Sequence, residues 1–220
     1  MKKKKYNFSI AIDGSSASGK TTGSKFISKM FGFKLLSSGK LYRYIAFKII
    51  KNKNKYNHKF IDKISKEITL NKLSSCNLYL PEITNLSSII AKKKKIRNSL
   101  KKFQTDFIKK NSKVVIEGRD IASKIMPNAD LKIFFKCSLE EKTKRRLKEF
   151  RKSNKRVSLV EVKKALKQRD FSDKNRKESP LLFTKGAVLV DTTNLNLNQM
   201  KTKLKRLVER TIKTKKYGSL

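Results

Sequence analysis

One segment near the start of the chain has the residue types and spacing of a phosphate-binding loop. Residues 14 to 21 read Gly-Ser-Ser-Ala-Ser-Gly-Lys-Thr, which matches Gly-x-x-x-x-Gly-Lys-Ser/Thr in full. Small side chains let successive backbone N–H groups surround an anion, and a helix beginning near Gly19 adds its positive end. We expect Lys20 to reach the β- and γ-phosphates of a nucleotide and the Thr21 hydroxyl to face Mg²⁺. The pattern predicts a nucleotide-binding loop of Gly14, Ser15, Ser16, Ala17, Ser18, Gly19, Lys20, Thr21 and Thr22.

The flanking segments give this loop the context that the motif requires. An apolar run precedes it at residues 8–12, and Phe26, Ile27 and Met30 follow it at helical spacing. The sequence therefore predicts strand, loop and helix in that order. A serine-rich turn that happens to carry one lysine is the alternative, and this context argues against it.

Two further observations narrow the kind of phosphate chemistry. A GTPase would need Asp-x-x-Gly and Asn-Lys-x-Asp, and neither string is present. Transfer of a phosphoryl group to an existing phosphate needs no strong general base, because the acceptor oxygen is already anionic. His58, the single histidine, lies in a run of Lys and Asn, and we expect it to be exposed. The sequence favours a small-molecule phosphotransferase.

Arginines in this lysine-rich chain mark positions where a planar, bidentate cation is needed. Five of them lie in contexts that suggest anion clamps on loops at strand ends, where open α/β sheets bind ligands: Arg43, Arg97, Arg119, Arg169 and Arg176. Taken singly, each could instead form a surface ion pair. We interpret the others as surface residues: Arg145, Arg146, Arg151, Arg156, Arg206 and Arg210.

Short apolar runs alternate with helical patterns along most of the chain, which is typical of an α/β fold. Further strands are expected at 34–37, 114–116, 131–135 and 187–190, and helices at 139–150, 159–168 and a last one beginning near Leu197. Ser38 is a candidate cap for the second helix. These elements predict a parallel sheet of about five strands flanked by helices.

We expect a single domain over residues 1–220 with two embedded parts. The core would comprise 6–52 and 113–216, and a small sub-domain with strand-like pieces at 68–70 and 77–80 would be inserted at 53–112. Residues from Asp170 onward lack an apolar period, which predicts a loop at about 169–182, the segment for which the family resemblance described below implies a lid.

Charge and composition bear on partners. The formal net charge is +40, from 57 Lys and Arg against 17 Asp and Glu, and a nucleic-acid-binding protein is therefore one hypothesis. Lysines are spread over almost every polar stretch, so we expect a basic surface and no specific nucleic-acid partner. No apolar run is long enough for a membrane helix, and the two cysteines are far apart. A cytoplasmic monomer is the expectation.

Several strings together resemble the bacterial cytidylate kinase family, in the same order over nearly the whole chain. They are the loop with Ile12-Asp13 before it, residues 35–43 (Leu-Leu-Ser-Ser-Gly-Lys-Leu-Tyr-Arg), 117–120 (Glu-Gly-Arg-Asp), 169–181 and 190–193. The resemblance implies a P-loop kinase fold with an inserted monophosphate-binding sub-domain and a lid. It also implies transfer of the ATP γ-phosphate to CMP or dCMP with Mg²⁺. A different nucleotide kinase, for UMP or AMP, is the alternative.

The resemblance also implies roles for individual residues. Ser38, Arg43, Arg119 and Arg176 would hold the monophosphate, Asp173 the sugar hydroxyls, and Arg169 the transferring phosphoryl group. Ser88, Arg97 and Asp120 would read the cytosine. The catalytic set would be Lys20, Arg119, Arg169 and Arg176.

This sequence departs from the family pattern at several positions. Ser37 stands where the family usually has Asp, and Lys174 where it usually has Arg. Thr21 stands where the family usually has Gly before Thr22, so either threonine could face the metal. The inserted region is somewhat short.

Overall fold

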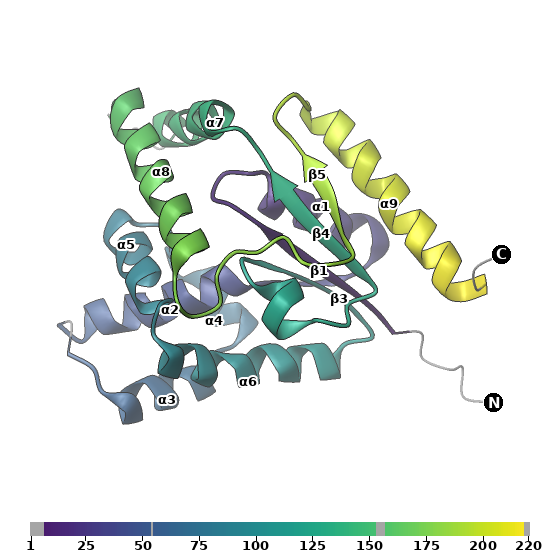
Figure 1. The fold of residues 1–220 in the computed structure, drawn as a ribbon. Coiled ribbons are helices and arrows are strands. Elements are labelled where there is room, and N and C mark those ends of the chain that lie inside the picture. Colours follow the sequence, from purple (N-terminus) through teal and green to yellow (C-terminus); the bar gives the residue numbers. More distant parts are fainter. Residues whose placement is uncertain (1–6, 54, 153–156, 218–220) are drawn as a thin grey trace. The chain divides into compact units, whose positions relative to one another are not determined.

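The computed structural model describes residues 7–53, 55–152 and 157–217. Contacts divide the chain into two compact units, Met1–Leu35 with Ser112–Leu220, and Leu36–Asn111, and each is described by itself. The strands are β1 (Phe8–Gly14), β2 (Lys34–Ser37), β3 (Lys113–Gly118), β4 (Leu131–Lys136) and β5 (Ala187–Asp191). Figure 1 shows their arrangement.

The sheet confirms the predicted α/β class. Its five strands lie in the order β2-β3-β1-β4-β5, which places β1 at the centre. β1 pairs in parallel with β3 and with β4, and β4 pairs in parallel with β5. Because parallel strands end at a common edge, the residues that follow β1, β3 and β4 are brought together there.

Apolar packing fixes the helices of the first unit against this sheet. α1 (Lys20–Phe31) and α9 (Leu197–Tyr217) place Ile27, Leu204 and Val208 in one core with strand residues such as Ile10 and Ile133. α9 packs on α1, and both helices are labelled in Figure 1. A five-residue π-helical segment, η1 (Ile121–Ile125), follows β3 closely. This core packs around the central strand β1 and thereby positions the loop that leaves its end.

α7 (Leu139–Lys152) and α8 (Leu159–Asn175) pack on each other through Leu147, Val162 and Leu166. α8 starts with a capping box, in which the Ser158 hydroxyl accepts from the Glu161 N–H and the Glu161 carboxylate accepts from the Ser158 N–H.

The prediction of a loop from Asp170 was wrong up to residue 175, because α8 continues to Asn175. This last part of the helix shows no apolar period, since the side chain that it buries is Asp173, paired with charged groups. An irregular segment from Arg176 to Gly186 then leads to β5. Only this second part of the predicted lid is a loop.

The second unit is built from helices. They are α2 (Ser38–Lys51), α3 (His58–Lys66), α4 (Leu70–Ser75), α5 (Pro81–Ile90) and α6 (Lys94–Lys110). α2 packs on α5, and α3 packs on α6. This unit starts at Leu36 and includes α2, whereas the sequence analysis placed the start of the insertion at residue 53.

Three local predictions in the second unit were wrong. Residues 68–70 and 77–80 are not strands; Thr69 caps α4 by accepting from the Lys72 N–H, and residues 78–79 form a turn before α5. Ser38 does not cap α2 but is its first helical residue, because β2 runs directly into the helix. Apolar residues here, such as Ile68 and Leu78, are buried between helices and not in a sheet.

Candidate active site

The phosphate-binding loop leaves the central strand and leads into α1, as its sequence predicts. Gly14 lies opposite Phe135 of β4, and a Cβ at Gly14 would lie 2.6 Å from the Phe135 carbonyl oxygen. Gly19 precedes α1 with a φ of 90°, a left-handed conformation that favours glycine. The two glycines of the motif are therefore required by close approach at one end of the loop and by backbone conformation at the other.

Lys20 is buried against the loop. Its Nζ donates to the Ser15 carbonyl oxygen at 2.9 Å. Burial and the nearby Arg119 charge together lower the pKa of Lys20 to about 7, although the Glu117 carboxylate acts in the opposite direction. An anion that entered this loop would supply the counter-charge that Lys20 lacks.

The two threonines at the start of α1 have different surroundings. Thr21 donates from Oγ1 to the Glu117 Oε1 at 3.3 Å, at the end of β3, whereas Thr22 is exposed. Hydroxyl and carboxylate oxygens are ligands that Mg²⁺ accepts, usually together with substrate phosphates. Thr21 and Glu117 thus fit a magnesium ion. Among the described residues there is no group of three or more His, Cys, Asp or Glu side chains that could hold a metal without a substrate.

Asp13, the residue before the loop, is buried and organises the segment after β3. Its carboxylate accepts from the backbone N–H groups of Ile121 at 2.9 Å and Ala122 at 2.8 Å. Burial raises the pKa of Asp13 to about 6, although these two hydrogen bonds lower it. Asp13 therefore fixes the backbone immediately after Arg119 and Asp120.

Four of the predicted site residues form one buried network. Arg119 donates from Nε to Asp173 Oδ2 at 2.7 Å, and the two guanidinium nitrogens of Arg176 lie 3.7 Å from the carboxylates of Asp120 and Asp173. Burial would lower the pKa of Arg119, but Asp173 raises it above its usual value. Two cations and two carboxylates are thus held in one network. A nucleotide phosphate could replace a carboxylate as the partner of an arginine, and a nucleotide hydroxyl could donate to a carboxylate.

The prediction that the five arginines lie on loops at strand ends was wrong for most of them. Only Arg119 directly follows a strand. Arg43, Arg97 and Arg169 lie on helices, and Arg176 ends α8. Arg169 lies close enough to Lys20 and Asp173 to affect the pKa of both. A long arginine side chain can reach a site from the face of a helix as well as from a loop.

Three cations on α7 lie against the loop, and the sequence analysis missed them. Lys142 Nζ lies 3.4 Å from Ser15 Oγ, and Arg146 donates to Ser16 Oγ at 3.1 Å. Arg145 donates to both oxygens of Thr192, whose hydroxyl donates to the Ser18 carbonyl. Interpreting Arg145 and Arg146 as surface residues was wrong. The sequence did contain one indication of their role. These residues lie on the helix that follows β4, and β4 is the strand next to β1, which leads into the phosphate-binding loop.

The other predicted substrate residues lie in the second unit. Ser38 is buried at the start of α2, and Arg43 lies over the ring of Tyr79 at 4.8 Å. Arg97 of α6 is buried, its guanidinium carbon lies over the Tyr42 ring at 5.4 Å, and it donates to the Ala91 carbonyl at 3.0 Å. Ser88 is half-buried on α5. Two arginines of this unit are thus held over aromatic rings, which favours defined orientations.

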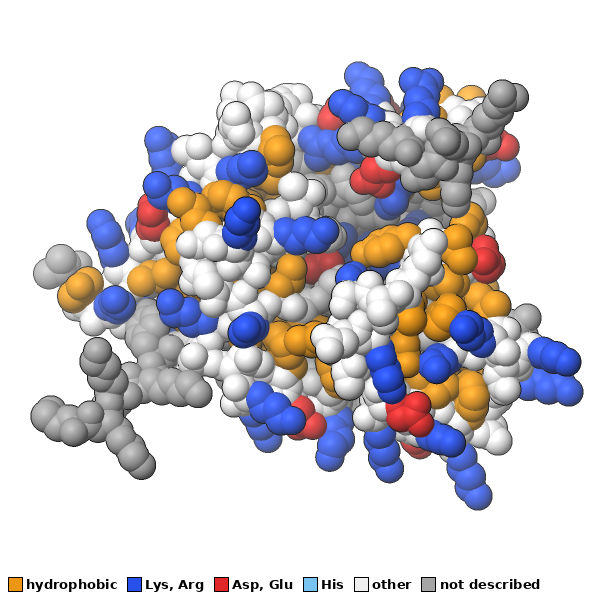
Figure 2. Space-filling model, turned by 180° about the vertical axis from the view of Figure 1, so that it is seen from behind, with side chains coloured by type: hydrophobic (Ala, Val, Ile, Leu, Met, Phe, Trp, Pro, Cys, Tyr) orange, Lys and Arg blue, Asp and Glu red, His pale blue; other side chains and the backbone are white. Residues whose placement is uncertain are grey.

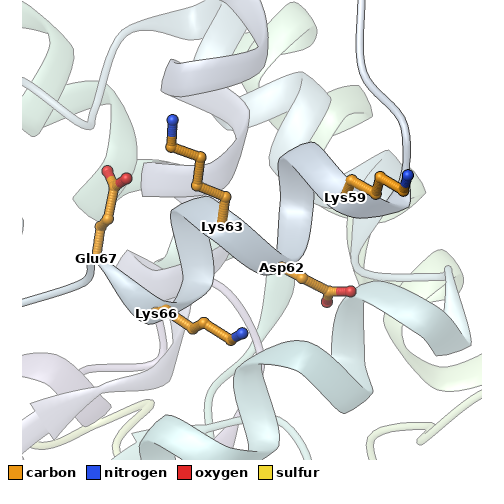
Figure 3. Close-up of a pocket in the computed structure, with 5 residues that line it drawn as sticks. All are labelled: Lys59, Asp62, Lys63, Lys66 and Glu67. Atoms are coloured by element: carbon orange, nitrogen blue, oxygen red, sulfur yellow. The ribbon is translucent and has the colours of Figure 1, made fainter.

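A surface hollow on α3 of this unit is a different feature. Figure 3 shows its lining, in which Lys63 and Asp62 leave the helix on opposite sides and the side chains do not converge on a common point. His58, at the start of the same helix, is exposed, as expected. The hollow contains none of the predicted site residues.

Comparison with known proteins decides the family. The cytidylate kinase profile matches residues 10–210, most of the chain. The chain belongs to the cytidylate kinase family. A cytidylate kinase of Fusobacterium nucleatum subsp. nucleatum is 34% identical over 93% of this kinase and 98% of its own length, and one of Thermosipho melanesiensis is 35% identical over 91% and 96%. The chain is therefore an enzyme of the kinase class.

The fold of the kinase is also found among solved structures. An uncharacterized protein from Eubacterium ventriosum matches it with a TM-score of 0.54 over 94% of this chain and 99% of that one. The identity is 14%, so this likeness concerns the fold alone.

The surface of the kinase matches the expected spread of charge. Figure 2 shows Lys and Arg side chains scattered over the visible face, with few acidic ones between them. None of the described helices is both long and apolar enough to cross a lipid bilayer.

Proposed function

We propose that this kinase transfers the γ-phosphate of ATP directly to CMP and dCMP, giving CDP and dCDP. The observation that carries the proposal is the buried network of Arg119, Asp120, Asp173 and Arg176 in the same unit as the phosphate-binding loop. Such a network supplies fixed cations for phosphates and fixed carboxylates for hydroxyl and amino groups. Catalysis then consists of positioning and charge neutralisation.

On the ATP side, the backbone N–H groups of residues 14–20 would surround the phosphates. Lys20 would leave the Ser15 carbonyl and bind the β- and γ-phosphates, regaining a full positive charge as it does so. Arg119, Arg169 and Arg176 would neutralise the charge on the transferring group. Thr21, with Glu117 beside it, would hold Mg²⁺, which supplies further charge neutralisation on the phosphate oxygens when bound.

On the acceptor side, Ser38 and Arg43 would hold the monophosphate together with Arg119 and Arg176. Asp173 would accept from the sugar hydroxyls. Ser88, Arg97 and Asp120 would read the edge of the cytosine. The position of Arg97 over the Tyr42 ring, with its hydrogen bond to the Ala91 carbonyl, supports a reading role, because these two contacts restrict the orientation of the guanidinium.

A substrate panel tests the proposal. With ATP and Mg²⁺, a coupled assay should give turnover of CMP and dCMP well above that of UMP, AMP and GMP. Arg97→Ala and Asp120→Ala should raise KM for CMP and leave ATP affinity unchanged. Turnover of AMP or GMP with none of CMP would overturn the base assignment.

We further propose that the enzyme acts as a cytoplasmic monomer on free nucleotides and has no specific nucleic-acid partner. The scattered charge in Figure 2 supports non-specific contacts at most. Light scattering should give the mass of one chain. Binding to nucleic acid should fall steeply between about 50 and 200 mM salt, as counterion release requires. Sequence-selective binding that survives the higher salt would contradict this part of the proposal.

A further inference from the structure

Lys142 and Arg146 lie one turn apart on α7 and contact consecutive residues of the phosphate-binding loop. Lys142 faces the Ser15 hydroxyl, and Arg146 binds the Ser16 hydroxyl. The carboxylate that pairs with Arg146 belongs to Glu149, whose side chain is 60% exposed. The surroundings of Lys142 are different, because its partner carboxylate is much less exposed.

The Lys142 ammonium pairs with the carboxylate of Asp170, on α8. The exposed fractions of the two side chains are 7% and 15%. The other carboxylate oxygen of Asp170, Oδ1, is buried and has no hydrogen-bond partner in the described part of the chain. The pair thus joins the loop to α8 and leaves one polar atom unsatisfied.

Stability alone does not account for such a pair. Removing two charges from water costs more than a buried pair usually returns, and apolar residues of similar size often serve as well. An unsatisfied carboxylate oxygen adds to the cost. The position of the Lys142–Asp170 pair is more informative. Ser15 of the phosphate-binding loop lies between two buried ammonium groups, because Lys20 donates to its carbonyl and Lys142 contacts its hydroxyl.

We propose that Lys142 is a further ATP-binding residue and that Asp170 competes with the triphosphate for its ammonium group. In the empty enzyme Asp170 neutralises Lys142. When ATP enters the loop, the ammonium turns to a phosphate oxygen and Asp170 loses its partner. A lysine suits this exchange, because its compact charge on a flexible stem can change partners without the geometric demands of a guanidinium. The inference rests on the proposed function, since it takes ATP as the ligand.

The exchange would also connect ATP binding to α8. Asp170 directly follows Arg169 and precedes Asp173, which binds Arg119. Release of Asp170 would free the turn of α8 that carries Arg169 when the phosphates arrive. ATP binding would in this way act on the residues proposed to neutralise the transferring group.

The proposal is tested by whether Asp170→Asn raises or lowers the Kd for ATP. ATP affinity is measured by calorimetry on the full chain, with Mg²⁺ and without an acceptor. Lys142→Met should raise the Kd for ATP about tenfold, the size expected for one charge-assisted contact. Asp170→Asn should lower the Kd several-fold, because a competitor for Lys142 is removed. In the Lys142→Met background, Asp170→Asn should change nothing further.

A matched control removes a positive charge from an exposed position of α7. Lys144→Met should leave the Kd for ATP within about twofold of wild type, because exposed charges are screened. Lys142→Arg should keep most of the affinity that Lys142→Met loses. If Asp170→Asn does not fold, the comparison of Lys142→Arg with Lys142→Met decides alone.

Three outcomes overturn the inference: a Kd raised by Asp170→Asn as much as by Lys142→Met, an unchanged Kd in Lys142→Met, or equal losses in Lys142→Met and Lys142→Arg. The first would make the pair a structural link. Failure of the proposed function gives a different result. Without an ATP site, the wild-type protein would not bind ATP at all, and a wrong acceptor base would appear in the substrate panel while these Kd values kept their pattern.

Discussion

Arg119 Nε donates to Asp173 Oδ2 at 2.7 Å, and this contact joins the end of β3 to the last turn of α8 across 54 positions of the chain. Burial by itself would raise the pKa of Asp173, but the charge and hydrogen bond of Arg119 hold it below its usual value. Arg169 and Arg176 act in the same direction. The pair positions an arginine and a carboxylate that the proposed function uses on different parts of the substrate.

Breaking this pair should lower stability in a pH-dependent way. Asp173→Asn leaves Arg119 buried without its counter-charge, so the free energy of unfolding should fall by about 3 kcal/mol at pH 7. A carboxylate with a lowered pKa stabilises the fold above its ordinary value of about 4, and this contribution is lost as the pH falls through the folded-state pKa. Urea denaturation at pH 7 and pH 3 measures both values. Glu178→Gln is the control, and an equal effect of both variants would contradict the assignment.

Lys20→Met should abolish phosphoryl transfer without weakening the fold. The substitution removes a buried cation whose pKa is already lowered, so the melting temperature should stay the same or rise. Turnover should fall by about a hundredfold or more, the usual effect of losing one group that stabilises transition-state charge. A coupled assay and a thermal melt measure the two effects. Lys29→Met, on the exposed side of α1, should change neither.

ATP binding should be accompanied by proton uptake above neutral pH. Lys20 has a pKa of about 7 in the empty enzyme, so at pH 8 it is mostly neutral, and phosphate binding should recharge it. Calorimetry in buffers of different ionisation enthalpy measures the uptake, which should approach one proton and disappear in Lys20→Met. Equal heats in all buffers for the wild type would refute a neutral Lys20.

The lowered pKa of Lys20 also makes the free energy of unfolding of the empty enzyme depend on pH. An unfolded lysine titrates near 10.4, so the unfolded chain binds more protons than the empty folded enzyme between about pH 7 and 10. Through Lys20, the stability of the empty enzyme should therefore rise with pH over this interval. In Lys20→Met this part of the slope should be absent, as denaturation at pH 7 and pH 9 can show.

Asp13 should make the stability of the protein fall as the pH rises between about 4 and 6. Its pKa of about 6 lies above the ordinary value of about 3.9, so the folded protein binds more protons than the unfolded chain in between. The stability due to Asp13 is complete below pH 4 and is lost as the pH rises to 6. In Asp13→Asn this dependence should vanish, which denaturation between pH 4 and 6 can measure. A slope that persists in the variant would show that another group is responsible.

Asp13→Asn should also reduce turnover at pH 7. An amide offers one oxygen where the carboxylate offers two to the Ile121 and Ala122 N–H groups, so the segment that follows Arg119 and Asp120 would be less firmly held. KM for the monophosphate should rise more than KM for ATP. A change confined to ATP would contradict this positioning role.

Features that depend on neighbouring residues could be predicted without the structure. The loop at residues 14–21 follows from glycines, small side chains and Lys20 at fixed spacing, and the five strands follow from short apolar runs. Arg119 was identifiable because a strand and a Glu-Gly pair precede it directly. These are local signals, and local physics is sufficient to predict them.

Only the tertiary structure decided which distant side chains complete the site. Lys142 and Arg146 lie 127 and 130 positions from Ser15 and Ser16, and they reach the loop because β4 pairs beside β1. The end of α8 has no apolar period, because it buries Asp173 against Arg119 and not against an apolar core. Contacts between charged groups so far apart leave no periodic trace in the sequence, since their energy depends on burial and distance, which the packed fold alone defines.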